Sequence, residues 1–430
     1  MSKKVNMETR EELLGLHSLN PFIPTVSSAR GYMLSNMFSQ IITVKNGDEK
    51  IIQSGLEQQF GDNTFSKKLK HDSRILSVIK RYNGVDVNQV NYTTGLLVLF
   101  EDLVTNEIDY IEVPNYFSLH QYFGFEYVWN NDILNNLTKN TVLKADTVLA
   151  DSPTVTTNKG YKYGFNANVA LMTIPEVSED PVIISERFSK KMEYDIFERI
   201  VVEFGTDDFP LNIYGDDDNY KAFPEIGERI NEHSVVMALR EKDTEMSGAL
   251  FSRRDLQSFN PMFDKAFYVK KPGGIVHDIK VIHSPKHKKD SFLGSIEGVM
   301  KYANSLKQYY SDIVESFERI EREKQMQNRG TVLKVSPKLH RLLLDAYVMV
   351  NPDNKKVKYT HRNEPLDIYR IEFVIKHTIQ PKVGAKITNL AGGKGIIAEV
   401  RETSKMPKDP LTGEYADIVM DPTSTPGYQV

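Results

Sequence analysis

The feature that most constrains the fold is one long amphipathic segment that lies between two strand-rich regions. From Phe292 to Met326, apolar residues recur at steps of three and four positions, which places them on one face of an α-helix. A second helix is predicted shortly after it, with Ser336 as its N-cap and Pro337 at the first helical position. Together the two segments predict an antiparallel helical hairpin over residues 292–349.

Strand-rich sequence flanks this helical hairpin. The first 190 residues contain apolar runs, such as Gly95 to Phe100, separated by glycine, proline and asparagine turns. After the hairpin, residues 368–375 are predicted to form a strand that leads into a lysine-rich segment. A chain of 430 residues corresponds to roughly three units of about 150 residues. We therefore expect an α+β fold, mainly β, with the hairpin inserted into a β domain.

The composition excludes several classes of protein. The absence of cysteine excludes thiolate zinc sites, iron-sulfur clusters and cysteine nucleophiles. The longest apolar runs are far shorter than the ~20 residues that span a bilayer, and the polar start has no signal-peptide stretch. These features predict a cytosolic protein without a membrane partner.

Charge is distributed unevenly along the chain. The formal net charge of −4 argues against a protein that binds nucleic acid with its whole surface. Acidic residues outnumber basic ones between Leu171 and Ile230, whereas basic residues outnumber acidic ones between Asn351 and Lys408. One face could therefore meet phosphate while another repels it. Solvated loops of opposite sign are the alternative interpretation.

A lysine- and glycine-rich segment is the strongest candidate for phosphate chemistry. Lys386 and Lys394 flank a loop whose glycines would let backbone N–H groups approach a phosphate. It is not a Walker A loop, because Thr388 and Gly395 stand where that motif requires glycine and serine or threonine. Two alternatives remain: a glycine turn between two strands with solvated lysines, or a turn of a small nucleic-acid-binding β-barrel.

Other polar groups are weaker candidates by themselves. Residues 216–218 are three aspartates that lack the glycine and glutamate of a calcium loop, so we predict a solvated turn. His283 and His287 have a proline between them, which argues against a metal-binding pair on a helix. Glu179 and Asp180 precede an apolar run and are typical of the start of an ordinary strand.

Four groups of motifs, in order along the chain, resemble a known family. These segments are similar to the C-terminal half of the β subunit of multisubunit DNA-dependent RNA polymerase. They are residues 18–23 (SLNPFI) with 29–40 (ARGYMLSNMFSQ), residues 148–154 (VLADSPT) with 164–166 (GFN) and 179–187 (EDPVIISER), residues 272–279 (PGGIVHDI), and residues 379–386 (IQPKVGAK) with 393–395 (GKG), 406–407 (MP) and 417–422 (DIVMDP).

The resemblance implies a double-psi β-barrel that is interrupted by a flap. It assigns residues 1–188 to the first part of the β-subunit core, including barrel strands and a link segment. Residues 189–365 become a flap-like insertion that carries the helical hairpin. Residues 366–430 become the second part of the barrel, with the active-centre lysines. The resemblance therefore implies that one barrel is built from both ends of the chain.

Substrate-binding roles follow from the same resemblance. Arg30 matches an arginine that faces the triphosphate of the incoming nucleotide. Asn36 and Gln40 match residues that line the RNA path. The implied ligands are therefore nucleoside triphosphates, template DNA and nascent RNA.

The resemblance also implies catalytic roles for four charged residues. Lys386 and Lys394 match the lysines at the RNA 3′ end, and Glu179 and Asp180 match the acidic pair on the side where nucleotides arrive. Fixed cations stabilise the negative charge that spreads over phosphate oxygens during nucleotidyl transfer. The cofactor is expected to be Mg²⁺ held mainly by the β′ counterpart, with no metal held by this chain alone and Asp180 near the nucleotide-bound ion.

The chain departs from the family pattern in extent and at single positions: it lacks the family's N-terminal lobes and its C-terminal clamp segment, which predicts only part of a β subunit. Leu390 and Ala391 stand where the family has Arg-His, and Tyr428 stands where it has an arginine. We expect a split β subunit like those of large-genome (jumbo) bacteriophages, located in the host cytoplasm or the virion. Its expected partners are the remaining β fragments, β′ fragments and a promoter-specificity factor. The alternatives are a stand-alone nucleic-acid-binding β-barrel protein and a non-catalytic scaffold derived from β.

Overall fold

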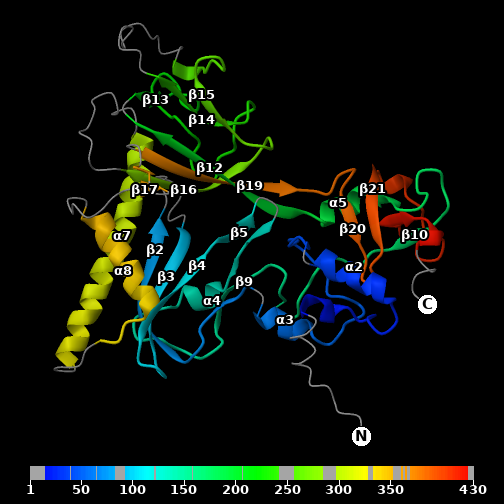
Figure 1. Ribbon diagram of the computed structural model, residues 1–430, viewed down its shortest axis with the longest axis horizontal. Coiled ribbons are helices and arrows are strands. Elements are labelled where there is room, and N and C mark those ends of the chain that lie inside the picture. Colours follow the sequence, from blue (N-terminus) through cyan, green and yellow to red (C-terminus); the bar gives the residue numbers. More distant parts are fainter. Residues whose placement is uncertain are drawn as a thin grey trace.

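The computed structural model of the chain is mostly β-sheet, with one long helix and several shorter ones (Figure 1). This composition agrees with the predicted α+β class. The residues that the structure describes are 15–38, 40–63, 65–82, 93–120, 123–156, 158–205, 207–241, 256–283, 297–327, 333–351, 360–361, 364–365 and 369–424.

An antiparallel sheet of four strands, in the order β4-β3-β2-β8, forms one side of the molecule. The predicted apolar run lies in β3, which is covered on both faces: Leu97 and Leu99 join one core, and Leu96 joins another. A strand that is buried on both faces needs a continuous apolar run. The strands are β2 (Ser73–Tyr82), β3 (Thr93–Asp102), β4 (Ile108–Pro114) and β8 (Val142–Leu143).

Both predicted helices are present, as α7 (Glu297–Gln327) and α8 (Pro337–Val350). Residues 292–296 of the predicted hairpin lie outside the described residues. Helix α7 packs against α8 and, with it, against Leu97 and Leu99 of β3. The hairpin thus shares a core with strands of the first predicted segment. The apolar stripe is the buried face of α7, and its buried members include Val299, Leu306, Ile313, Phe317 and Ile320.

Loss of the Ser336 hydroxyl is expected to destabilise the chain by about 1–2 kcal/mol. Ser336 Oγ accepts a hydrogen bond from Leu339 N at 3.1 Å and donates one to Asp109 Oδ1 at 2.6 Å. Ser336→Ala removes both bonds at the start of α8. The control is Ser311→Ala, because Ser311 Oγ bonds at 3.0 Å to the exposed Glu315 side chain, and it should cost less than about 0.5 kcal/mol. Equal urea midpoints for the two variants would contradict the cap.

A long antiparallel ribbon connects the two ends of the molecule (Figure 1). Strands β12 (Tyr194–Phe204) and β19 (Tyr369–Ile379) pair along their whole length, and β16 (Ile275–His283) pairs with the other edge of β19. Strands β12 and β16 belong to the predicted insertion 189–365, whereas β19 belongs to the predicted segment 366–430. The sheet therefore contains strands from both sides of the predicted boundary at residues 365 and 366. The division of the chain at this boundary stays a prediction.

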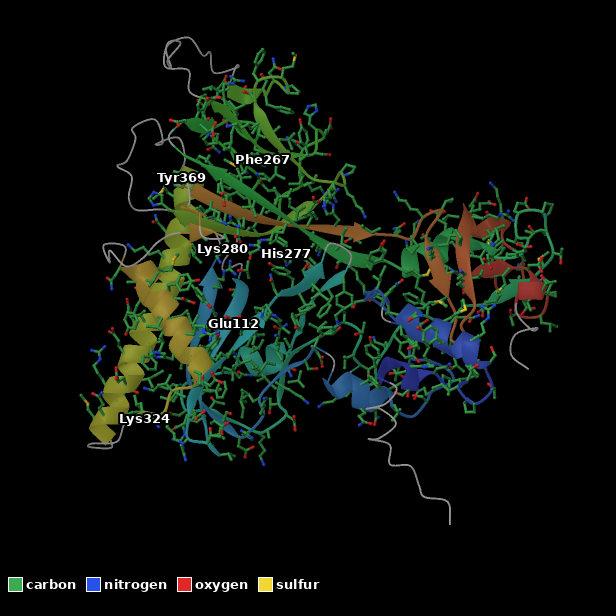
Figure 2. The ribbon with its side chains drawn as sticks, in the orientation of Figure 1. Glu112, Phe267, His277, Lys280, Lys324 and Tyr369 are labelled. Carbon is green, nitrogen blue, oxygen red and sulfur yellow. The ribbon has the colours of Figure 1, made fainter. Side chains whose placement is uncertain are left out.

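The two faces of this sheet differ in polarity. One face carries Phe373 and packs against Tyr302 of α7 in the largest apolar core. The other face is charged: Lys280 of β16 lies opposite Glu372 of β19, and Glu372 Oε2 contacts Arg199 Nη2 at 2.6 Å. Burial lowers the pKa of Lys280. Figure 2 marks Lys280 along β16. Alternation between apolar and charged side chains thus sets which side of the ribbon faces the core.

A second, smaller sheet packs beyond this ribbon (Figure 1). Its strands are β13 (Asp208–Pro210), β14 (Val235–Glu241) and β15 (Lys265–Tyr268), paired antiparallel in that order. At its edge Asp264, whose side chain is fully buried, accepts hydrogen bonds from Arg240 Nε and Nη2, both at 2.8 Å. Asp264 also accepts the Asn260 amide at 2.6 Å. The buried carboxylate therefore fixes the turn before β15.

A five-stranded mixed sheet lies at the opposite end of the ribbon, in the order β10-β22-β11-β21-β20. Pairs β10/β22 and β11/β21 are parallel, whereas β11/β22 and β20/β21 are antiparallel. This sheet joins strands from two distant parts of the chain. They are β10 (Val169–Leu171), β11 (Pro181–Ser185), β20 (Lys386–Thr388), β21 (Lys394–Arg401) and β22 (Ile418–Met420).

Short elements complete the described fold. The helical ones are η1 (Gly15–Leu19), α2 (Ser28–Phe38), α3 (Glu57–Asn63), α4 (Asn131–Leu134), α5 (Glu186–Lys191), η3 (Thr403–Lys405) and η4 (Pro422–Ser424). The strands are β1 (Lys67–Lys68), β5 (Tyr116–His120), β6 (Phe123–Glu126), β7 (Val128–Trp129), β9 (Val148–Asp151), β17 (Thr360–His361) and β18 (Glu364–Pro365). Of these, α2 and α5 lie beside the five-stranded sheet (Figure 1).

Candidate functional site

Lys386 and Lys394 lie on the adjacent strands β20 and β21, and both are exposed. In the antiparallel register, Thr388 lies opposite Lys394 and Ile396 lies opposite Lys386. Paired residues project to the same side of a sheet, as do residues two positions apart, so the two lysines share one face. Diagonal neighbours in such a pair are about 7–8 Å apart. The two ammonium groups can therefore reach the same phosphate or neighbouring phosphates.

The turn between these strands, residues 389–393, is held by its own side chains. Asn389 Oδ1 accepts the N–H groups of Ala391 at 3.0 Å and Gly393 at 2.9 Å. Thr388 Oγ1 donates to the Gly393 carbonyl at 2.8 Å. The expectation that the loop's N–H groups approach a phosphate is therefore wrong for these two groups, because Asn389 already satisfies them. The groups at this hairpin that could still contact a phosphate include the two exposed lysine side chains.

Arg30 connects helix α2 to this turn. Its Nη1 donates to the Gly392 carbonyl at 3.2 Å. Gly392 has φ +80, and a Cβ added there would lie 2.5 Å from the Arg30 carbonyl oxygen. Only glycine tolerates both this dihedral angle and this close backbone approach. The sequence thus brings residues from the two ends of the chain into direct contact.

Leu390 explains one departure from the family pattern. It packs against an apolar cluster that contains Leu34, Phe38 and Tyr163. The side chain therefore anchors the 389–393 turn to α2 at the position where the family has a cationic residue. A long charged side chain at this position would lose that apolar contact.

Glu179 and Asp180 adjoin the strand that carries Lys394. Both are exposed and immediately precede β11. The Asp180 carbonyl accepts the Ile396 amide at 3.1 Å, and Pro181 pairs with Ile396 in the parallel β11/β21 ladder. Glu179 has φ 69, a left-handed conformation that costs a non-glycine residue of order 1 kcal/mol. The acidic pair and the two lysines therefore lie at one region of the sheet.

Asn36 lies in the C-terminal part of α2, and Gln40 lies two residues beyond the end of this helix. Gly31, Leu34 and Phe38 form the buried face of this helix. A rotation of about 100° per residue turns Asn36 away from that face, and Asn36 and Gln40 are both exposed. They lie on the solvent side of the segment, whereas Arg30 is half-buried against the turn. Tyr428, the residue at the position of the family's second arginine, lies outside the described residues, as does His287.

The described residues contain neither a cluster of metal ligands nor a membrane-spanning helix. Across the part of the chain that the structure describes, no three His, Asp or Glu side chains gather as a metal site. The described helices include none that is both long enough and apolar enough to cross a bilayer.

Residues 216–218 form the predicted turn, in which Asp216 Oδ1 accepts the Asp218 amide at 3.0 Å and the Asn219 amide at 2.7 Å.

Comparison with known families identifies the family to which the chain belongs. The family model described as RNA polymerase Rpb2, domain 6, matches residues 130–427, more than half of the chain. The chain belongs to the RNA polymerase Rpb2 domain 6 family. No curated protein matches it. The matched region is a β-subunit-like part of RNA polymerase.

The Rpb2 domain 6 match includes four of the seven predicted site residues. Glu179, Asp180, Lys386 and Lys394 lie inside residues 130–427, whereas the segment with Arg30, Asn36 and Gln40 precedes them. The structure joins the two parts through the Arg30 bond to the 389–393 turn. Sequence reasoning missed Asn389, although an asparagine near glycines is a known turn former whose side chain bonds nearby backbone amides.

Proposed function

We propose that this chain is a fragment of the β subunit of a DNA-dependent RNA polymerase that supplies charged residues to the nucleotidyl-transfer centre. The observation that carries the proposal is the convergence of two lysines, an acidic pair and Arg30 around one exposed hairpin of a mixed sheet. Lys386 and Lys394 face the RNA 3′ end and the reacting phosphoryl group. Arg30 faces the nucleotide triphosphate, and Asn36 and Gln40 line the RNA path.

The chemistry follows from the charge of the transition state. Nucleotidyl transfer spreads negative charge over phosphate oxygens as the 3′ hydroxyl attacks and pyrophosphate leaves. Preorganised cations aimed at that charge lower the barrier more than they stabilise the bound substrate. The shared face of β20 and β21 supplies two such cations. The two parallel strand pairs, joined by the antiparallel β11/β22 pair, support a double-psi β-barrel as their framework.

The described residues do not fit a resident magnesium site. Mg²⁺ prefers octahedral oxygen ligands and is held by carboxylates together with substrate phosphates. Glu179 and Asp180 are consecutive and exposed, and no third acidic group joins them among the described residues. We therefore assign the Mg²⁺ to the β′ counterpart and derive no step through it. The proposal assigns Asp180 a position near the nucleotide-bound ion.

The proposal requires partners. A complete enzyme needs the remaining β fragments, β′ fragments, a promoter-specificity factor, template DNA and nascent RNA. Residues 189–365 form a flap-like insertion that acts on DNA, RNA or the specificity factor away from the active centre. The resemblance to split β subunits supports a gene of a large-genome bacteriophage, with the polymerase in the host cytoplasm or packaged in the virion.

Purification from the natural host tests this function. The tagged chain is expected to copurify with other β-like and β′-like polypeptides, and this complex should extend RNA on a DNA template. The single chain should be inactive, because it lacks the metal-holding aspartates that the proposal assigns to β′. Mass spectrometry and a primer-extension assay provide the two measurements. Templated synthesis by the single chain, or recovery without any polymerase polypeptide, would contradict the proposal.

A further inference from the structure

The side chain of Asn389 occupies the concave side of the 389–393 turn. Its Oδ1 atom accepts two amides, from Ala391 at 3.0 Å and from Gly393 at 2.9 Å. Backbone N–H groups that converge on one point are the donors that bind an anion in other loops. Here a neutral amide oxygen of the same chain takes that place. The turn is therefore closed internally before any ligand arrives.

Four further contacts hold the same turn. The Asn389 amide donates to the Gly393 carbonyl at 3.0 Å, and Thr388 Oγ1 donates to that carbonyl at 2.8 Å. On its other side, Arg30 Nη1 holds the Gly392 carbonyl at 3.2 Å and Leu390 packs against the cluster on α2. Gly393 is followed directly by Lys394. The direction in which Lys394 leaves the turn thus depends on the bonds that Asn389 makes.

We propose that Asn389 is a positioning residue for Lys394, a role that rests on the proposed polymerase function. Its carboxamide oxygen pins the Ala391 and Gly393 amides, and this sets the direction in which Lys394 leaves the turn. The bonds are exposed to solvent, so they contribute little to global stability. Their effect is on geometry, and a misplacement of about 1 Å at a reacting centre can cost up to about 10²-fold in rate.

Phosphate can be bound either by backbone amides of the turn or by the lysine ammonium groups, and the closed turn favours the ammonium groups. With Ala391 and Gly393 amides already bonded, the negative charge of RNA and nucleotide is met by ammonium groups rather than by backbone donors. Asn389→Ala frees both amides and loosens Lys394. Asn389→Asp keeps an oxygen acceptor at the same position and should preserve the turn. The pair of variants therefore separates the acceptor from the side chain as a whole.

The experiment uses the assembled polymerase and single-nucleotide addition on an RNA–DNA scaffold. Asn389→Ala is expected to lower kcat about 10-fold with less than a twofold change in KM for the nucleotide, and Asn389→Asp should stay within threefold of wild type. The double variant with Lys394→Ala should be no slower than Lys394→Ala alone, because both act through one ammonium group. A merely structural role would give additive losses.

Asp409→Ala is the matched control. Asp409 Oδ1 accepts the Leu411 amide at 2.8 Å, so it closes a similar turn outside the site. Its removal should leave kcat unchanged. Hydrogen exchange gives a readout that does not depend on activity: Asn389→Ala should speed exchange of the Ala391 and Gly393 amides about 10-fold and leave the amides of β11 unchanged.

The outcomes distinguish the two proposals. A normal rate for Lys394→Ala would remove the catalytic assignment itself. A slow Lys394→Ala together with a normal Asn389→Ala would overturn the positioning role alone. Equal losses for Asn389→Ala and Asn389→Asp would also overturn it, since the acceptor would then be irrelevant. Unchanged exchange at the turn in Asn389→Ala would do the same.

Discussion

Replacing Lys386 or Lys394 by alanine is expected to slow nucleotide addition by about 10²-fold to 10³-fold. Both side chains are exposed on one face of the β20–β21 hairpin, so their loss removes charge without leaving a cavity. Each substitution deletes a preorganised cation aimed at the charge that develops on phosphate. The measurement is single-nucleotide addition by reconstituted complexes on one RNA–DNA scaffold.

Lys405 and Lys408 are the controls for these lysines. Lys405 Nζ lies 3.1 Å from the exposed Glu402 carboxylate, and Lys408 Nζ lies 5.6 Å from the centre of the Tyr415 ring. Their alanine variants should cost less than about 1 kcal/mol, because exposed ion pairs contribute little. If all four variants extend RNA at similar rates, Lys386 and Lys394 are surface residues and the catalytic assignment is wrong.

Loss of the Arg240 guanidinium is expected to destabilise the β13–β14–β15 sheet by about 3–5 kcal/mol. Arg240 donates twice to Asp264, whose side chain is fully buried, so Arg240→Ala leaves a buried carboxylate without its cation. The measurement is native-state hydrogen exchange at amides of β14 and β15. Lys265→Ala is the control: the Lys265 side chain is 60% exposed and its Nζ lies 3.0 Å from Asp208 Oδ1, so the substitution should lower the free energy of unfolding by less than about 1 kcal/mol.

The Arg240 pair also predicts a pH dependence. Burial by itself raises the pKa of Asp264, but the Arg240 and Asn260 hydrogen bonds outweigh it and hold the pKa below its usual range. The stability from this shift is therefore present above the ordinary aspartate pKa of about 3.9 and is lost as the pH falls through the lower folded value. In Arg240→Ala, the free energy of unfolding should therefore fall less between neutral and acid pH than it does in the wild type. An unchanged pH profile would contradict the assignment.

Local patterns predicted the helices, because their causes are local. The stripe from Val299 to Ile320 is the buried face of α7, and Ser336 with Pro337 begins α8 as expected. Helical periodicity and capping depend on residues three or four positions apart. The partner of α7 could not be predicted in this way, since an apolar stripe identifies a buried face but not the sheet that covers it.

The site was predictable only in part for the same reason. The positions of Lys386 and Lys394 on one face follow from their spacing across a short turn. The contact between Arg30 and Gly392 joins residues from the two ends of the chain, and only the resemblance to a family indicated that these segments work together. The two bonds that Asn389 makes do not follow from the glycines of the loop, which indicate conformational freedom but not the contacts that close the turn.

The order of strands in the five-stranded sheet has a consequence for synthesis on the ribosome. Strand β11 pairs with β21 on one side and β22 on the other, and β10 pairs with β22. Strands β20, β21 and β22 come from the C-terminal part of the chain, so all residues from Glu186 to Ala385 are translated before β20 emerges. Until then the nascent chain carries Ile183 and Ile184, fully buried in the finished fold, on a strand without these neighbours. A prematurely terminated chain can therefore complete the sheet of β2, β3 and β4 but not the sheet that displays Lys386 and Lys394.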